Sequence, residues 1–463
     1  MLKKYFGDRK FYKMVLLLAI PIMIQNGITN FVNMLDNVMV GQLGTEAMSA
    51  VSIVNNLMFV FNLTVFGAIS SAGIFTAQYH GLGDRNGIRS TFQFKLIIIA
   101  VTGVLGLAIF IFGKDLLINM FLHDSESAGD LVLTLDYARK YLMIMLIGLL
   151  PYALSQAYAS TLRETEQTVV PMVASIVAVA TNFVFNYILI FGHFGAPTLG
   201  VAGAAIATVI SRFIELLILV IWTHKNTDRC AFIVGAFRSF HIPRELTKKI
   251  ISKGLPLMFN EIFWSTAVTF VTQAYSTRGL DVVAALNISN TLNNLFNIVY
   301  IALGSSIAIV VGNLLGAGKL DEARDTDRKM ITFSVLCSLG MAVVLAIVAP
   351  FIPLLYNTTD TVRDLATYMM WVIAAVMPFC AFCHASYFTL RSGGKVFVTF
   401  LFDSVYMWLV VAPIAFFLSR FTPASIFIIY PICQGLEIPK VVFGAILLKK
   451  TSWVRQLVSK SET

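Results

Sequence analysis

The sequence predicts an all-α integral membrane protein whose twelve transmembrane helices form two six-helix lobes, related to each other as parallel repeats. Three observations predict this fold class. Of the 463 residues, 57% are hydrophobic and 13% are charged, whereas about a quarter of the residues of a soluble domain carry charge. Twelve apolar segments reach the roughly 20 residues that a helix needs to cross a bilayer. The first part of the chain also recurs in its second half.

The repeat aligns residues 21–89 with residues 256–324 without a gap, at an offset of 235 positions. It contains 15 identities over 69 positions, and seven of them are Gly, Asn or Ser, which seldom pair by chance in apolar sequence. An internal duplication of this kind predicts two related lobes. In polytopic membrane proteins, two such lobes are typical of transporters that move their halves about a shared site.

Six spans are expected in the first lobe, residues 1–223. They lie near residues 13–39, 47–78, 91–113, 131–160, 168–191 and 199–223. The first span contains Pro21 and is too long for the apolar core of a cleavable signal. The second span ends at Gly81 and Gly83, and the polar run TLRETEQTVVP (residues 161–171) closes the fourth span and opens the fifth. Each proline inside a span removes a backbone hydrogen bond and therefore permits a bend.

Six further spans are expected in the second lobe, residues 248–448. They lie near residues 248–276, 281–315, 327–350, 362–390, 396–419 and 424–448. Pro256 opens the first of them, at the repeat position of Pro21. Residues 224–247 form the longest polar connection, which we interpret as a cytoplasmic linker. Residues 449–463 form a basic cytoplasmic tail, for which a short interfacial helix on anionic lipid and a solvated segment are both open.

The formal net charge of +9 is distributed in a way that indicates membrane topology and argues against nucleic acid binding. With the N-terminus inside, 27 of the 34 Lys and Arg, Lys95 and Lys440 among them, fall in segments assigned to the cytoplasmic side, and six fall on the other side. Such an excess follows the positive-inside rule. We therefore expect a monomeric, multi-pass protein of the plasma (cytoplasmic) membrane, surrounded by membrane lipid, with both termini in the cytoplasm.

Polar side chains within the spans are the candidate functional residues, because an ionisable group in hydrocarbon is costly unless it is paired or faces a cavity. The first span carries a polar stripe at helical spacing. Its members are Gln25, Thr29, Asn33, Asp36 and Asn37. In the fifth span Asn182 and Asn186 are four residues apart and share one face. Carboxylate, amide and hydroxyl oxygens suit Na⁺, or a shared proton, although interhelical hydrogen bonding is the open alternative.

The second lobe offers fewer candidates. Glu261 lies deeper on the cytoplasmic side than Asp36 does, and Asp403 lies in the segment LFDSVYMW. His384 is a candidate for proton coupling because the reference pKa of histidine is about 6.5. The C-x-x-C-H pattern that ends at His384 matches haem attachment, but it lies inside an apolar span, where a packing role is the better interpretation. We expect no cofactor apart from a coupling ion.

Further motifs mark both halves of the chain. They are Asp36 with Gly41 and Gly44, Gln78 with Gly81 and Gly83, TLRETEQTVVP, NFVFNYILIFG (residues 182–192), GVAGAAIATVIS (residues 200–211) and TLRSGGK (residues 389–395). In these motifs the chain resembles the multidrug and toxic compound extrusion (MATE) family. The resemblance covers nearly the whole chain, from Pro21 to about Arg391 and more loosely to Lys450.

The resemblance implies two six-helix lobes that form a V around a central cavity, and efflux of amphipathic, mostly cationic compounds in exchange for Na⁺ or H⁺. It also implies a first-lobe cation site at Asp36, Asn182 and Thr208. The acid that the family carries four residues after the asparagine is replaced here by Asn186. In one branch of the family a second-lobe site pairs a glutamate, roughly at Glu261, with an aspartate whose position is held here by Cys380.

Three other functions stay open. A flippase or exporter of a lipid-linked or other native metabolite would line its cavity with several arginines, and only Arg212 lies in mid-span. A passive channel would let its solute follow the gradient without a counter-ion. An intramembrane enzyme would need a catalytic constellation, and the chain contains no H-E-x-x-H, no G-x-S-x-G and no nucleotide-binding loop, so we do not expect an enzyme.

Overall fold

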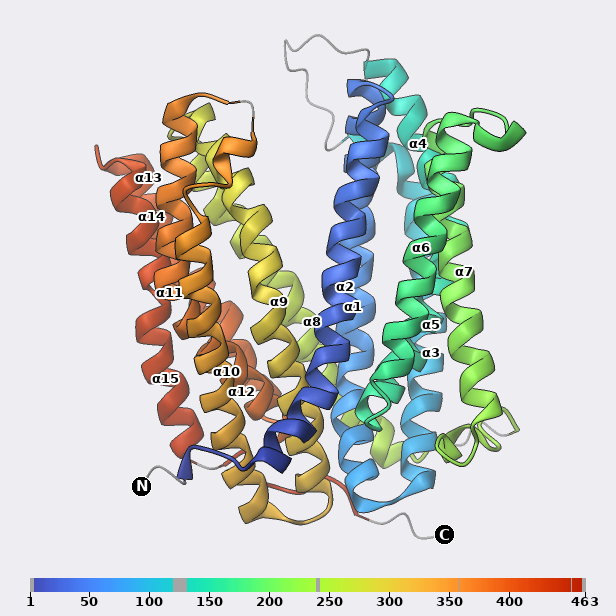
Figure 1. Ribbon diagram of the computed structural model, residues 1–463. Coiled ribbons are helices and arrows are strands. Elements are labelled where there is room, and N and C mark those ends of the chain that lie inside the picture. Colours follow the sequence, from blue (N-terminus) through green and yellow to red (C-terminus); the bar gives the residue numbers. More distant parts are fainter. Residues whose placement is uncertain (1–3, 120–130, 239–241, 357, 451, 460–463) are drawn as a thin grey trace. The chain divides into compact units, whose positions relative to one another are not determined.

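Every regular element of the part of the chain that the structure describes is a helix (Figure 1). A computed structural model describes residues 4–119, 131–238, 242–356, 358–450 and 452–459. Ten of its helices are long and apolar enough to cross a membrane, and one bent pair of helices supplies an eleventh span. The twelfth expected span corresponds to α8, which carries Asn260 and Glu261 in its middle and is less apolar than the others. The all-α membrane fold class is confirmed.

The helices of the first half follow the expected spans closely. They are α1 (Arg9–Gly41), α2 (Thr45–Leu82), α3 (Arg85–Asn119), α4 (Leu131–Ile147), α5 (Leu149–Glu164), α6 (Val169–Phe191) and α7 (Val201–Lys225), with short turns at η2 (His193–Gly195) and η3 (Ala231–Ile233). The span expected near residues 131–160 is bent by 46° between α4 and α5. Pro151 lies at the start of α5 and has no N–H to continue the ladder across the break at Gly148.

The second half repeats this pattern of long helices. They are α8 (Arg244–Ser276), α9 (Leu280–Gly316), α10 (Leu320–Val348), η4 (Pro353–Leu355), α11 (Asp360–Ser392), α12 (Val396–Phe400), η5 (Leu401–Val405), η6 (Met407–Val411), α13 (Ala412–Phe421), α14 (Ile426–Gly435) and α15 (Glu437–Lys449). The elements from α12 to α13 form one span that contains two π-helical turns, η5 and η6. Such turns are rare and often lie at functional sites.

The chain folds into two compact units. Unit 1 contains Met1–Met23, Ala77–Asp84 and Leu255–Thr463, and unit 2 contains Ile24–Thr76 and Arg85–Gly254. The first turns of α1 therefore belong to the unit of the second-half helices, and the first turns of α8 belong to the unit of the first-half helices. In each of these two helices the boundary between the units lies within a few residues of the repeated proline, Pro21 or Pro256. The lobe bounds 1–223 and 248–448 stay predictions.

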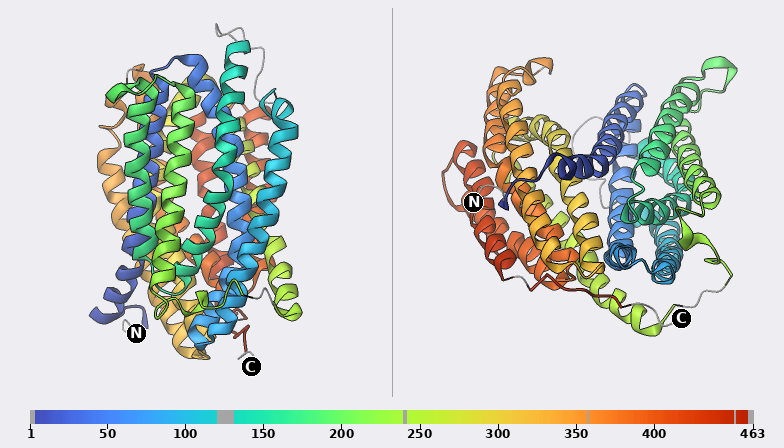
Figure 2. Two further views of the ribbon diagram at one scale, coloured as in Figure 1. Left: turned by 90° about the vertical axis from the view of Figure 1, so that its right-hand side faces the viewer. Right: turned by 60° about the horizontal axis from the view of Figure 1, so that its bottom comes forward.

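Each unit has a helical core of its own. In unit 2, α6 packs on α7 and α3 on α5, and these helices run beside one another in the side view of Figure 2. In unit 1, α11 packs on α9 and on α15. Val15 and Ile22 of α1 belong to the same buried cluster as Leu303 and Val310 of α9. The start of α1 is thus held by apolar contacts with the second-half helices.

The duplication is visible in the backbone as well as in the sequence. Gly83 and Gly318, which the repeat aligns, both have a φ of +74° within two residues of the end of a long helix. Only glycine adopts this left-handed conformation without strain, and it is a common way to end a helix. The identity of these two glycines therefore records the same helix-ending turn in both halves.

The close contact between the ends of α2 and α9 involves repeat-related residues on both helices. A Cβ atom on Gly81 would overlap the backbone carbonyl of Asn313, and a Cβ atom on Gly316 would overlap the backbone carbonyl of Gln78. Because the offset of 235 positions converts one contact into the other, the two helix ends cross about a local two-fold axis within unit 1.

Alanine at Gly81 or Gly316 is expected to lower the unfolding temperature of the purified protein. The added methyl group meets backbone atoms, which no side-chain rotation relieves, and overpacking of this kind costs about 1–3 kcal/mol. Thermal unfolding in detergent measures the change. Gly340→Ala in α10 is the matched control, because open space surrounds that glycine. Equal unfolding temperatures for all three variants and the unchanged protein would contradict the close contact.

Residues 452–459 form an extended strap along the ends of the unit 1 helices, so both the interfacial helix and the solvated tail expected there are wrong (Figures 1 and 2). Trp453 is 1% exposed. Arg455 Nε donates to the carbonyl of Gly393 at 2.9 Å, Gln456 Nε2 donates to that of Gly316 at 2.7 Å, and Leu457 N donates to Gln78 Oε1 at 2.7 Å. The strap thereby satisfies carbonyl groups that helix ends leave unpaired.

Candidate functional site

A polar cavity of about 300 Å³ lies within unit 2, between α1, α2, α4, α6 and α7. Its polar lining residues are Asp36, Asn37, Asn55, Asn62, Tyr141, Asn186, Thr208 and Arg212. Apolar and aromatic side chains complete the wall, Met58, Phe59 and Met145 among them. The cavity is at the lower end of the size range of small-molecule sites, and with eight polar residues among the 14 that line it, it is more polar than most of them.

Asp36 is the centre of the hydrogen bonds in this cavity. Asn186 Nδ2 donates to Asp36 Oδ1 at 2.6 Å. Asn182 lies one turn earlier on α6 and is within hydrogen-bonding distance of Asp36, Asn186 and Thr208. The i, i+4 spacing places both amides on the same face of α6. Both are almost fully buried, with exposed fractions of 1% for Asn186 and 5% for Asn182. The structure therefore brings together the four residues predicted for the first lobe.

The Asn182 amide satisfies its neighbours in one of its two orientations. With the nitrogen toward the carboxylate, it donates to Asp36 Oδ1 at 2.9 Å and to Oδ2 at 3.1 Å, while its oxygen accepts from Thr208 Oγ1 at 3.2 Å. A half turn of the amide places the oxygen next to the two carboxylate oxygens instead. In the second orientation three oxygens converge on one point, which is an arrangement for a bound cation and not for a hydrogen bond.

Among the described residues, the carboxylate of Asp36 has no charged partner. No basic side chain of the described residues lies within 4.0 Å of it. Two buried amide oxygens of the cavity-lining residues, Asn186 Oδ1 and Asn62 Oδ1, also accept no hydrogen bond from the described chain. A buried anion beside orphaned acceptors is unstable in hydrocarbon unless a proton or a cation is supplied. The Asp36 carboxylate could thus hold a proton, and with neighbouring amide oxygens it could hold Na⁺.

Arg212 of α7 also lines the cavity, but other groups hold it. Its guanidinium lies 5.1 Å from the centre of the Tyr152 ring, and NH1 donates to the carbonyl of Gly148 at 3.4 Å. The same carbonyl also accepts a hydrogen bond from the backbone N of Tyr152 at 3.1 Å, and it lies where α4 and α5 are broken. The tyrosine ring and the Gly148 carbonyl thus hold the one arginine among the residues that line the cavity.

The remaining predicted residues with described side chains have other partners. Gln25 Oε1 accepts a hydrogen bond from Arg163 NH1 at 3.5 Å, and the side chain of Asn33 lies outside the described residues. The second-lobe candidates lie in unit 1. Tyr387 donates to Glu261 Oε1 at 3.3 Å, Lys440 Nζ donates to Asp403 Oδ1 at 2.9 Å, and His384 packs against the Tyr300 ring at 5.1 Å. Of the polar stripe expected on α1, Asp36 and Asn37 line the cavity, whereas Gln25 bonds to Arg163.

Asn55 and Asn62 of α2 line the cavity and were not predicted as site residues. These two residues are seven positions apart and therefore share a helix face. The signal for them was present in the repeat, which preserves Asn55 as Asn290 and Asn62 as Asn297. Amide side chains retained in both halves of an apolar chain are candidates for a lining role.

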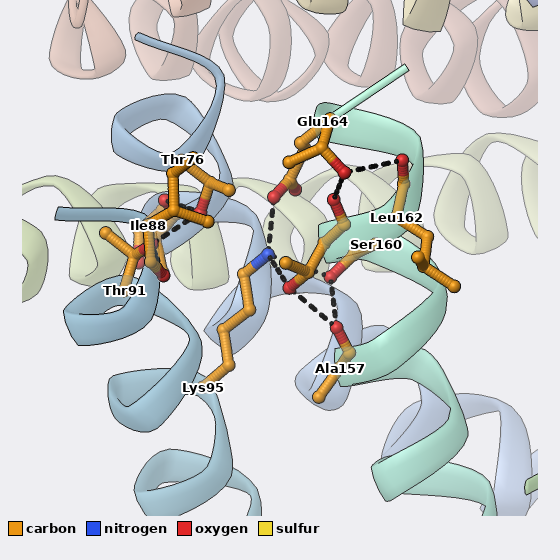
Figure 3. A network of polar contacts seen from close by, with 12 residues as sticks. Thr76, Ile88, Thr91, Lys95, Ala157, Ser160, Leu162 and Glu164 are labelled. Carbon is orange, nitrogen blue, oxygen red and sulfur yellow. Dashed lines mark hydrogen bonds and ion pairs between the residues drawn. The ribbon is translucent and has the colours of Figure 1, made fainter. Parts of the chain in front are cut away.

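A buried ion pair in unit 2 was also missed (Figure 3). Lys95 of α3 is fully buried, and its Nζ lies 2.5 Å from Glu164 Oε2 and 3.0 Å from both Ser160 Oγ and Thr161 Oγ1 of α5. Lys440 is buried as well. Each lysine lies inside a helix with a carboxylate partner, and the membrane side on which it lies stays a prediction.

Comparison with known families and sequences agrees with this architecture. The family model described as MatE matches residues 21–188 and 256–417. The chain is similar to the probable multidrug resistance protein NorM of Thermotoga maritima, with 23% identity over 411 residues that cover 88% of this chain and 86% of that protein. It is also similar to the multidrug resistance protein MdtK of Edwardsiella ictaluri, with 26% identity over 376 residues that cover 81% and 79%.

Solved structures show the same fold. One is described as the outward-facing conformation of a multidrug resistance MATE family transporter of the MOP superfamily. It matches with a TM-score of 0.84 and 19% identity, over 97% of this chain and 98% of that one. A second, described as MATE in the bent conformation, matches with a TM-score of 0.83 and 20% identity over the same shares.

Proposed function

The chain belongs to the MatE family, and on this basis we propose that it is a secondary active multidrug efflux transporter. It exports amphipathic, mostly cationic compounds by alternating access, in antiport with Na⁺ or H⁺. It acts in the plasma membrane with both termini in the cytoplasm. The observation that carries the proposal is the half-buried Asp36 carboxylate, which lies in a cavity without a cationic partner among the described residues.

Exchange at Asp36 requires only that two ligands compete for one negative charge. An organic cation in the cavity is attracted to the ionised carboxylate, and a proton or Na⁺ that binds the carboxylate removes that attraction. The Asn182 amide supports both states, because its nitrogen donates to the free carboxylate and its oxygen adds a ligand for a metal cation. Each ligand then shifts the conformational equilibrium by its differential affinity for the inward and outward states.

The wall of the cavity supports an amphipathic substrate. Phe59 and Tyr141 offer aromatic rings to a delocalised cation, and Met58 and Met145 offer adaptable apolar contacts. Arg212 opposes a second positive charge, so a monovalent cation with an apolar body fits better than a polyamine. A polyanionic or lipid-linked substrate finds a single guanidinium here, which gives the flippase alternative no support.

The coupling ion binds the single carboxylate of Asp36. The neighbouring position, where a second acid could supply another carboxylate, is occupied by Asn186. Asn186→Asp is expected to lower the Na⁺ concentration for half-maximal transport by about tenfold or more, since the added negative charge contributes at least about 1.4 kcal/mol of attraction. Transport in proteoliposomes at varied external Na⁺ measures this. Asn37→Asp adds the same charge to the cavity wall away from that hydrogen bond and serves as the control. Equal Na⁺ dependence in both variants would refute the role of Asn186.

Dye transport by purified protein in proteoliposomes tests the proposed function. Imposed Na⁺ and H⁺ gradients are applied separately, and ethidium accumulation is followed by fluorescence. Antiport predicts that at least one gradient drives ethidium against its own concentration gradient. A passive channel lets ethidium equilibrate without accumulation, and that result would overturn the proposal.

A further inference from the structure

Unit 1 contains a second buried charge cluster, which the exchange at Asp36 does not use. It joins the first π turn to α15. Lys440 Nζ lies 2.9 Å from Asp403 Oδ1 and 3.7 Å from Glu437 Oε1. The lysine side chain is 6% exposed and each acid 20%. The ammonium group is thus held between two carboxylates in the interior of a membrane-spanning unit.

The surrounding groups are arranged for a cation. The Lys440 ammonium lies 5.4 Å from the centre of the Phe402 ring, so an aromatic face adds to the two carboxylates. Asn260 Nδ2 donates to the other oxygen of Asp403 at 3.4 Å, and Ser404 Oγ fixes the Asn260 amide at 2.8 Å from its Oδ1. Asp403 itself lies in the π turn η5. Both carboxylate oxygens of Asp403 are therefore oriented by a neighbour.

The energetics of this cluster call for a resident positive charge. Two carboxylates that share one buried cation repel each other strongly once the cation leaves, and an unpaired charge in hydrocarbon costs several kcal/mol. Lys440 is covalently part of α15 and cannot diffuse away. A site of this kind is permanently filled, in contrast to the oxygens around Asp36.

We propose that the Lys440 ammonium is a tethered cation that fills an alkali-cation site of unit 1 formed by Asp403 and Glu437. The proposal rests on the proposed antiport and deepens it: the exchangeable ion binds at Asp36 alone, and a single monovalent ion is exchanged in each cycle. Removal of the ammonium opens the site to a free cation such as Na⁺, which takes the same carboxylate oxygens as ligands.

The test uses purified full-length protein in which Asp36→Asn silences the first site. Thermal unfolding is compared in NaCl and in choline chloride at equal concentration, with choline as the cation too large for the site. The Asp36→Asn protein is expected to unfold at the same temperature in both salts. Addition of Lys440→Met is expected to make unfolding sodium-dependent, with a midpoint about 3 °C or more higher in NaCl, because a ligand that binds only the folded state stabilises it.

Removal of one acid from the opened site is the matched control. With Asp403→Asn added to Asp36→Asn and Lys440→Met, the sodium effect is expected to disappear, because the first carboxylate ligand is gone. Lys440→Gln is the second variant, of similar length, in case the methionine protein does not fold. Sodium-dependent unfolding of either Lys440 variant supports the proposed cation site. This result would stand even if the unchanged protein proved to transport passively, so the two proposals can fail separately.

Two results would overturn it. One is a sodium effect in the Asp36→Asn protein that depends on Asp403 while Lys440 is intact. The other is the absence of any sodium effect in both Lys440 variants. Failure of both variants to fold in either salt would also overturn the proposal, since no free cation then replaces the ammonium.

Discussion

Asp36→Asn is expected to reduce gradient-driven ethidium transport by about 100-fold or more, a loss equal to about 2.7 kcal/mol of coupling free energy. Asp36 is the one carboxylate among the residues that line the cavity of unit 2. Asparagine has nearly the same shape and still accepts from Asn186, so the fold is retained while the charge that attracts both the organic cation and the coupling ion is lost.

Initial rates in proteoliposomes with equal amounts of protein measure the loss. Asp228→Asn is the control, because this acid is exposed in the segment after α7 and lies outside the cavity lining. Thermal unfolding of Asp36→Asn should match that of the unchanged protein. Normal transport by correctly inserted Asp36→Asn protein would remove the basis of the antiport mechanism.

Lys95→Met is expected to destabilise the protein by about 3–5 kcal/mol, which is the usual effect of removing one partner of a buried ion pair. The lysine is fully buried, and its loss leaves Glu164 without the ammonium 2.5 Å away (Figure 3). A Cβ atom on Gly73 of α2 would also overlap the Glu164 carboxylate, so that carboxylate has little room to move toward another partner.

The double variant Lys95→Met with Glu164→Gln should recover most of the lost stability, because the uncompensated charge is then removed. Lys140→Met serves as the control for an exposed pair. The charged groups of Lys140 and Asp136 lie 2.6 Å apart, but the side chains are 61% and 50% exposed. Loss of this ion pair should therefore leave the unfolding temperature nearly unchanged. If Lys95→Met unfolds no earlier than Lys140→Met, the buried pair does not stabilise unit 2.

Much of the helical architecture could be predicted from the sequence, because apolar segments of sufficient length must satisfy their backbone as helices in a membrane. The expected spans near residues 168–191 and 281–315 differ from α6 and α9 by at most one residue at each end. The repeat also predicted the positions of helix-ending glycines such as Gly83 and Gly318, since the same backbone conformation requires the same residue.

The rest depends on contacts between distant segments. The ion pairs of Lys95 and Lys440 were not predicted, because hydropathy records composition and not the carboxylate that a lysine meets after folding. The strap at residues 452–459 has a basic, mixed sequence, and only the exposed carbonyls of helix ends from elsewhere in unit 1 give it a place to bind. The convergence of Asp36 with Asn186 was predicted as a set of candidate ligands, but no spacing in the sequence gives the 2.6 Å contact between α1 and α6.

The most direct test of the account measures ethidium binding to purified protein while Na⁺ and H⁺ are varied separately at constant ionic strength. Competition for the Asp36 carboxylate predicts that at least one of the two cations weakens ethidium binding. Ethidium must then weaken the binding of that cation by the same factor, and Asp36→Asn must bind ethidium weakly and without response to either cation. Ethidium affinity that is independent of both cations, or an unchanged response in Asp36→Asn, would contradict exchange at this carboxylate.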